Sequence, residues 1–380
     1  MPTLLCPDRA FLARLLADGG EDLKRCFQCA TCAVTCDLSP TDRPFPRKEL
    51  LWAQWGLSDR LVSDPDIWLC HQCQDCTARC PRGARPGDVM AALRRESVRF
   101  HARPRALARW LERPRSLGIL FAAALALPAL AALWVAASGV VPARTESFAF
   151  ATWSWLPRGV LIGLYGALAG WVVVAAGLGV MGLWRGFGVP GPTVKGAAAS
   201  LAGALRRIVA HQDFSRCEAS RSRRIAHQAV LFGAVGLVVV DAWVLLGRFN
   251  PVLQALVYPW SFWNPWKIMA NVAGLAVLVG CGLMARDRLR CPGDAQPGTR
   301  ADWIFLGLLA AAVLTGFGIE LAHLARFTLK GVVYLAHLGT VAVLLLSLPY
   351  SRLAHALYRT TALVWAERYG RLPPEGGRHA

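Results

Sequence analysis

The sequence of 380 residues predicts an all-α protein with a small helical domain followed by a bundle of six transmembrane helices. Two cysteine runs of identical spacing lie in the first hundred residues, and six long apolar stretches follow residue 115. No strand-like alternation of polar and apolar residues stands out. We therefore expect four segments: a cluster domain over 1–93, a basic neck over 94–115, a membrane domain over 116–357 and a tail over 358–380.

The composition points to a membrane protein. Hydrophobic residues make up 55% of the chain and charged residues only 17%, which exceeds the apolar share that is usual in soluble domains. The net charge of +18 would also suit a nucleic-acid-binding protein, but no nucleic-acid-reading motif is present. The arginines cluster beside apolar stretches instead, which indicates anionic lipid as their partner.

The region 1–93 has the character of a small soluble domain. Helical patterns surround Leu12 and Leu50, and prolines interrupt the segment between the cysteine runs. The N-terminal stretch lacks a basic region followed by a long apolar one, so the sequence predicts no secretory signal. We expect this domain to face the reducing cytoplasm.

Each cysteine run has the C-x2-C-x2-C-x3-C spacing that wraps a [4Fe–4S] cluster, so two clusters are predicted. In two-cluster proteins the fourth cysteine of such a run ligates the other cluster. Pro81 follows the second run, as in the bacterial pattern, whereas Asp37 follows the first. The predicted ligand sets are Cys26, Cys29, Cys32 and Cys80 for cluster 1, and Cys70, Cys73, Cys76 and Cys36 for cluster 2.

Zinc is the alternative occupant of these cysteines. Zinc sites use paired C-x2-C hooks, often with histidine, and His71 lies inside the second run. Zinc would leave the third and fourth cysteines of each run without a role. The spacing therefore favours iron–sulfur clusters.

The neck over 94–115 contains eight arginines directly before the first apolar stretch. Its position predicts a juxtamembrane helix that lies on anionic headgroups, with Trp110 at the interface. The alternative is a solvated basic surface.

Six apolar stretches are long enough, or nearly so, to cross a hydrocarbon core of about 30 Å. The second contains Gly159-x3-Gly163 and Gly166-x3-Gly170, a spacing that lets helices approach closely. Loops on one side hold 17 lysines and arginines against 6 on the other, which places the cluster domain and the C-terminus inside. The predicted spans are 116–137, 159–184, 227–247, 266–285, 302–323 and 331–350.

Histidines at the ends of the spans are candidate ligands of one or two b-type haems. His337 and His355 are separated by five helical turns, or about 27 Å, so both would face the same way near opposite membrane surfaces unless Pro349 kinks the helix. His227 lies level with His355, and His323 lies level with His337. His211 is a competing ligand for the inner site.

Three ionisable residues near the outer membrane surface are candidates for a quinone site. Asp241, Lys267 and Glu320 could supply hydrogen bonds and a proton acceptor to a quinone headgroup. The alternative is that they snorkel to the interface.

The cysteine half, in IWLCHQCQDCTARCPRG (67–83), resembles the iron–sulfur (C-type) subunit of heterodisulfide reductases. The membrane half resembles the b-haem subunit of that system and the gamma subunit of respiratory nitrate reductases, on RRIAHQAVLFGAVG (223–236), NPWKIMANVAG (264–274) and YLAHLGTVAVLLLSLPYSRLAHALYR (334–359). The fusion resembles the membrane subunit of the quinone-interacting membrane-bound oxidoreductase complex. In the nitrate reductase relatives the first ligand helix carries a second histidine, where Leu237 stands here.

This resemblance implies an electron-transfer subunit in the inner membrane, with menaquinone or ubiquinone as the membrane carrier. It also implies two cytoplasmic flavin-bearing partner subunits and, through them, adenylylsulfate reductase. The runner-up is the membrane subunit of a heterodisulfide-reductase-like or sulfite-reductase-linked complex. A different class is a structural anchor without haem. No hydrolytic or transferase constellation is visible, so only quinone redox chemistry is expected on this chain.

Overall fold

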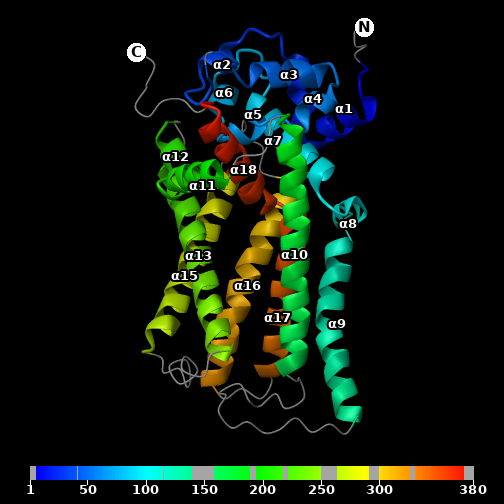
Figure 1. The fold of residues 1–380 in the computed structure, drawn as a ribbon, viewed down its shortest axis with the longest axis vertical. Helices are drawn as coiled ribbons and strands as arrows, with labels where there is room; N and C mark the ends of the chain where they lie inside the picture. The colour runs from blue at the N-terminus through cyan, green and yellow to red at the C-terminus, as the bar shows by residue number, and fades with distance from the viewer. Residues whose placement is uncertain are drawn as a thin grey trace.

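The structure is a computed structural model that describes residues 6–40, 42–113, 115–138, 158–188, 194–216, 221–249, 263–290, 299–325 and 330–371. Every regular element in these ranges is a helix (Figure 1). The cluster domain contains α1 (Arg9–Leu15), η1 (Leu16–Gly20), η2 (Glu21–Arg25), α2 (Thr31–Val34), α3 (Arg47–Gln54), α4 (Ser58–Leu61), α5 (Asp66–Leu69), α6 (Asp75–Ala78) and α7 (Pro86–His101).

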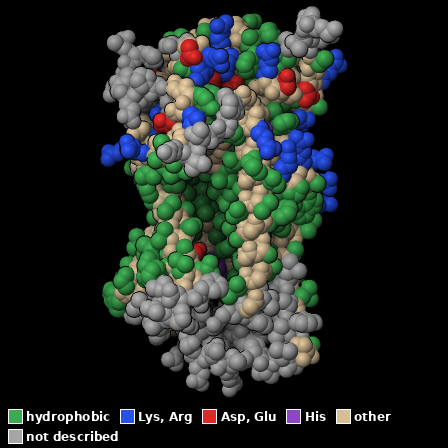
Figure 2. Space-filling view, viewed as in Figure 1, with side chains coloured by type: hydrophobic (Ala, Val, Ile, Leu, Met, Phe, Trp, Pro, Cys, Tyr) green, Lys and Arg blue, Asp and Glu red, His purple; other side chains and the backbone are tan. Residues whose placement is uncertain are grey.

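The elements after the cluster domain are α8 (Arg105–Leu111), α9 (Ser116–Ala137), α10 (Arg158–Gly186), α11 (Val194–Val209), α12 (Gln212–Arg216), α13 (Arg221–Phe249), α15 (Pro265–Arg290), α16 (Arg300–Leu324), α17 (Lys330–Ser347), η3 (Leu348–Tyr350) and α18 (Ala354–Arg368). The long helices run side by side beneath the cluster domain. Figure 2 shows Lys and Arg gathered at the cluster-domain end, hydrophobic side chains over the long helices, and a hollow between α10 and α13.

Five described stretches are long and apolar enough to cross a membrane: Leu161–Gly186, Arg221–Gly247, Pro265–Arg290, Arg300–Ala322 and Gly331–Arg368. They coincide with the second to sixth predicted spans. The helix α9 has the bounds of the first predicted span, and its continuous stretch of described side chains, Ser116–Ala126, forms a shorter apolar helix. These five helices indicate a membrane protein, and the sixth span stays a prediction.

Glycines allow α13 and α15 to pack closely, at positions that sequence patterns did not single out. A Cβ atom on Gly233 of α13 would lie 2.6 Å from the Ala273 carbonyl oxygen, and one on Gly280 of α15 would lie 2.8 Å from the Ala226 oxygen. The two backbones thus touch along α13 and α15. At Gly159, Gly163, Gly166 and Gly170 a Cβ atom would meet no described residue within 4 Å, so their predicted packing role stays a prediction.

The sixth predicted span does not continue as one helix to His355. The helix α17 ends at Ser347, the turn η3 contains Pro349, and α18 starts at Ala354. Proline has no N–H group for the helical ladder, which explains the break. The predicted alignment of His337 and His355 over five continuous turns is therefore wrong, because they lie on separate helices.

The cluster domain shares its core with the membrane helices. Buried residues of α1, α5 and α7, such as Phe11, Trp68 and Met90, form one cluster with Leu183 of α10 and Leu363 of α18. The predicted domain boundary at 93 falls inside α7, which runs on to His101, and the predicted tail from 358 begins inside α18. Local sequence patterns could not reveal this shared core, because the apolar residues of α18 pack against elements about 300 residues earlier.

Candidate functional site

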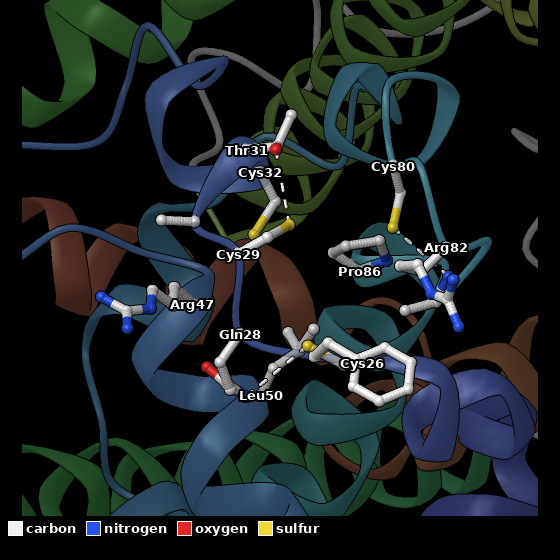
Figure 3. Close-up of a pocket in the computed structure, with 13 residues that line it drawn as sticks. Cys26, Gln28, Cys29, Thr31, Cys32, Arg47, Leu50, Cys80, Arg82 and Pro86 are labelled. Atoms are coloured by element: carbon white, nitrogen blue, oxygen red, sulfur yellow. Dashed lines mark hydrogen bonds between the residues drawn. The ribbon is translucent and has the colours of Figure 1, made fainter.

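Four cysteines of the predicted first set surround one hollow in the cluster domain (Figure 3). Cys26, Cys29 and Cys32 come from one loop and the start of α2, and Cys80 comes from the second run. The loop wraps the hollow because Gln28 and Ala30 adopt positive φ angles of 59° and 70°. The first run therefore supplies three sulfurs to the hollow, and Cys80 of the second run supplies the fourth.

The second hollow repeats this arrangement with the other four cysteines: Cys36, Cys70, Cys73 and Cys76 line it together with His71. Gln72 and Gln74 occupy the positions equivalent to Gln28 and Ala30, and their φ angles of 58° and 75° are also positive. The Gln72 backbone N–H donates to the Cys70 sulfur at 3.4 Å. The fourth cysteine of each run thus lies at the hollow of the other run, which is the crossed grouping that the spacing predicted.

The electrostatics of these cysteines suit a cationic metal core. Burial, together with the neighbouring thiols, raises the pKa of Cys32 and of Cys36 to about 12. Free thiols in this setting would stay protonated at neutral pH, whereas bound iron displaces the protons and compensates the four thiolates. Four sulfurs around one hollow match the donor set of a [4Fe–4S] cluster. The one described histidine at the second hollow, His71, packs its ring against Phe214 and is not counted among the metal ligands.

Three arginines from different helices hold the loop of the second hollow. Arg94 of α7 donates to the Cys70 carbonyl oxygen and, at 3.2 Å, to Gln72 Oε1. Arg223 of α13 donates to the Gln72 carbonyl oxygen at 2.8 Å, and Arg359 of α18 donates to that of Cys70 at 2.8 Å. The second cluster loop is therefore fastened to two helices, α13 and α18, that belong to the bundle.

These contacts revise the predicted lipid-binding neck. Arg94 contacts the cluster loop, and Arg95 and Arg99 bind Asp18 of the cluster domain. The first part of the neck therefore belongs to the fold of the cluster domain. The helix α7 continues through 94–101, where the polar residues Glu96, Ser97 and His101 are buried, and no apolar pattern signals this burial in the sequence.

Three of the predicted haem ligands share one hydrogen-bond arrangement. The Nδ1 atom of His227 lies 3.0 Å from His211 Nε2, that of His337 lies 3.1 Å from the Ala312 carbonyl oxygen, and that of His355 contacts the Arg352 carbonyl oxygen. Within the described residues, no hydrogen bond engages Nε2 of these three rings. An iron-ligating imidazole needs this arrangement, with one nitrogen oriented by a partner and the other available.

The structure describes both predicted histidines of the inner haem position but only one of the outer position. His227 lies near the cluster-domain end of α13. His355 lies in the first turn of α18, at the end that follows α17 and η3, whereas the opposite end of α18 reaches the cluster domain. The apolar hollow of Figure 2 opens beside α13. The Nε2 atoms of the two rings would be the axial ligands of a b-type haem, and their pairing stays a prediction. His211 hydrogen-bonds to His227, which suits an orienting partner better than a competing ligand. The side chain of His323 lies outside the described residues, so its pairing with His337 stays a prediction.

Two of the three predicted quinone-site residues meet. Lys267 Nζ lies 3.2 Å from Glu320 Oε1, and Asn271 Nδ2 lies 3.4 Å from the same oxygen. Asp241 makes no ion pair or hydrogen bond with another described residue. The structure thus assembles a polar group from α15 and α16 inside the bundle and leaves Asp241 apart from it.

Comparison with known proteins finds a match for each half of the chain. Residues 110–373 match the family model of citrate utilization protein B, and residues 22–84 match a 4Fe-4S dicluster domain. The first match covers more than half of the chain. The chain belongs to the citrate utilization protein B family. In this family member the dicluster match covers the two cysteine runs, so the chain carries [4Fe–4S] clusters.

Several curated relatives match the cluster half of this citrate utilization protein B family member. One subunit of the H2:CoB-CoM heterodisulfide,ferredoxin reductase of Methanothermobacter marburgensis is 38% identical over 95 residues, covering 24% of this chain and 50% of that protein. A protein of Archaeoglobus profundus that is described as similar to a heterodisulfide reductase subunit is 42% identical over 78 residues, covering 20% and 42%.

The chain spans about half the length of these curated relatives, and no solved structure matches it. Their names describe them as reductase subunits or as similar to one.

Proposed function

We propose that this chain relays electrons between cytoplasmic flavin-bearing partner subunits and a membrane quinone, through two [4Fe–4S] clusters and at least one b-type haem. One observation carries this proposal. Arg223 and Arg359, which hold the second cluster loop, each lie four residues, or one helical turn, from His227 and His355. The helices that fasten the cluster loop are therefore the helices that carry the proposed inner haem ligands.

The edge of the first hollow is the proposed docking place of the soluble partner. Cys29 is exposed there, and Phe27 and Val34 are 68% and 82% exposed. The Arg82 guanidinium lies 4.4 Å from the centre of the Phe27 ring. Exposed apolar residues beside arginine are typical of protein interfaces. This edge lies at the end of the molecule that is remote from the long apolar helices (Figure 1).

The quinone site is proposed at the Lys267–Glu320 pair. A charged pair inside apolar helices is costly unless it serves a function, and a quinone headgroup needs hydrogen-bond partners and a proton acceptor. Menaquinone and ubiquinone both meet this description. Asp241 is retained as a further acceptor on α13.

Two electron sources fit the partner side. The likeness to the quinone-interacting oxidoreductase complex favours adenylylsulfate reductase as the indirect partner, within sulfur metabolism. The match of residues 110–373 to the citrate utilization protein B family favours a flavin subunit that acts in the use of citrate. The two differ in which reduced flavin subunit transfers electrons to the clusters.

The test is a spectrum of the purified chain in detergent, with iron, sulfide and pyridine haemochrome measured on the same sample. We expect about eight iron and eight sulfide per chain from two cubanes, and a b-type haem signal. A quinol analogue should reduce that haem, and His227→Ala should weaken the signal. Clusters without haem would leave a structural anchor and would refute the proposal.

A further inference from the structure

A row of three aromatic rings joins the second cluster loop to the proposed inner haem position. The ring of His71, the residue after Cys70, packs edge-on against Phe214 with 4.1 Å between the ring centres. The Phe214 ring lies 5.5 Å from that of His227 and 5.3 Å from that of His211. These contacts connect the loop that carries Cys70 with a proposed haem ligand on α13.

Ion pairs of the neighbouring Asp213 hold α12, and with it the Phe214 ring, in place. Phe214 lies in α12, where Asp213 is held by Arg207 at 2.7 Å and by Arg359 at 2.6 Å. The Nε2 atom of His71 is buried and has no hydrogen-bond partner among the described residues. A buried polar nitrogen without a partner is costly, so neither stability nor polarity explains a histidine at this position.

We infer that His71 and Phe214 form the route by which an electron crosses from the second cluster to the haem bound through His227. This inference rests on the proposed function. One electron would leave the reduced cluster and would be accepted by the haem iron that His227 would hold. No bond is made or broken, and no proton is needed. His71 and Phe214 act as bridging residues and do not ligate either metal.

The experiment uses the full chain in detergent, loaded with clusters and haem. The clusters are reduced by a rapid photochemical donor, and haem reduction is followed by absorbance in a single turnover. We expect Phe214→Leu to slow this step several-fold, while Phe214→Trp, which keeps a ring, retains the rate. Phe187→Leu is the matched control, because Phe187 packs on Trp365, away from the row.

Further readouts separate a route from a structural role. Iron content, haem content and the potentials of both centres should be unchanged in Phe214→Leu, because no ligand is altered. If Phe214→Leu loses haem, the same comparison of haem-reduction rates is made at His71, with His71→Leu as the variant without a ring and His71→Phe as the variant that keeps one. An unchanged haem-reduction rate in both leucine variants would overturn the inference. Absence of haem from the unmodified chain would instead overturn the proposed function.

Discussion

At the scale of single residues, the crossed sharing of cysteines is the most distinctive feature of the cluster domain. Cys36 follows α2 in the first run, yet it lines the second hollow with Cys70, Cys73 and Cys76. The fourth cysteine of the first run therefore lies with the second run in space, although it belongs to the first run in the sequence. The crossed grouping can be tested by cysteine substitution without any partner protein.

Cys36→Ser and Cys76→Ser should remove the same cluster, because both side chains line the second hollow. Iron should fall from about eight to about four atoms per chain in each variant. The remaining electron paramagnetic resonance signal should be the same in both and should differ from that of Cys32→Ser. Cys281→Ser, in α15, is the control that should keep all the iron. Matching signals from Cys36→Ser and Cys32→Ser would contradict the crossed assignment.

His101 should make the stability of the protein depend on pH. Its Nε2 lies 3.1 Å from the Val62 carbonyl oxygen, and burial lowers its pKa to about 4. Because the folded pKa lies below the unfolded value of about 6.5, its contribution is complete above pH 6.5 and is lost as the pH falls towards 4. Between pH 6.5 and 5 this loss is roughly 2 kcal/mol.

The measurement is the thermal unfolding midpoint of the unmodified chain and of His101→Gln between pH 7.5 and 5. Glutamine can still hydrogen-bond to Val62 but does not titrate, so the stability advantage of the unmodified chain should shrink as the pH falls. A constant difference across this range would exclude His101 as the source.

At the scale of elements, the contact between α13 and α15 depends on glycine. Gly233→Leu would force side-chain atoms into the backbone of α15, at a cost of about 1–3 kcal/mol or more. We expect a lower midpoint of thermal unfolding and less bound haem, since α13 carries His227. Gly163→Leu, where a Cβ atom meets no described residue within 4 Å, is the matched control. Equal losses in both variants would argue against a specific contact at Gly233.

The elements also show how far sequence patterns reach. The apolar stretches and the cysteine runs are local patterns, so the positions of α10, α13, α15 and α16 and the grouping of the eight cysteines followed from spacing. The helix contacts did not, because a glycine spacing such as Gly159-x3-Gly163 does not reveal which face meets a neighbour. Nor did Phe214, since its contacts with His71 and His227 exist only once α12 has packed beside α13.

At the scale of the whole molecule, the two hollows have different neighbours. The row of rings leads from the second hollow to the proposed haem position, and the first hollow opens at the exposed edge near Cys29. This order predicts that damage to the exposed edge will affect exchange with the soluble partner and leave exchange with quinone intact. Phe27 and Phe100 offer a matched pair for this test, because each carries an arginine over its ring at 4.4 Å and 4.9 Å.

Phe27→Asp should raise the KM for the reduced flavin subunit about tenfold or more, as expected for an aromatic residue at the centre of an interface. Phe100→Asp should leave this KM unchanged. Reduction of the clusters from the quinol side should proceed normally in both variants. An equal effect of the two substitutions would place the docking surface elsewhere.

The core that α18 shares with α1, α5 and α7 has a consequence for the order of biosynthesis. The ribosome releases residues 9–101 long before residues 354–368, and every long apolar helix lies between them. Until α18 emerges, Trp68 and Met90 lack part of their final apolar environment. The cluster domain can therefore complete its apolar core only after α18, the last described helix of the chain, has been synthesised.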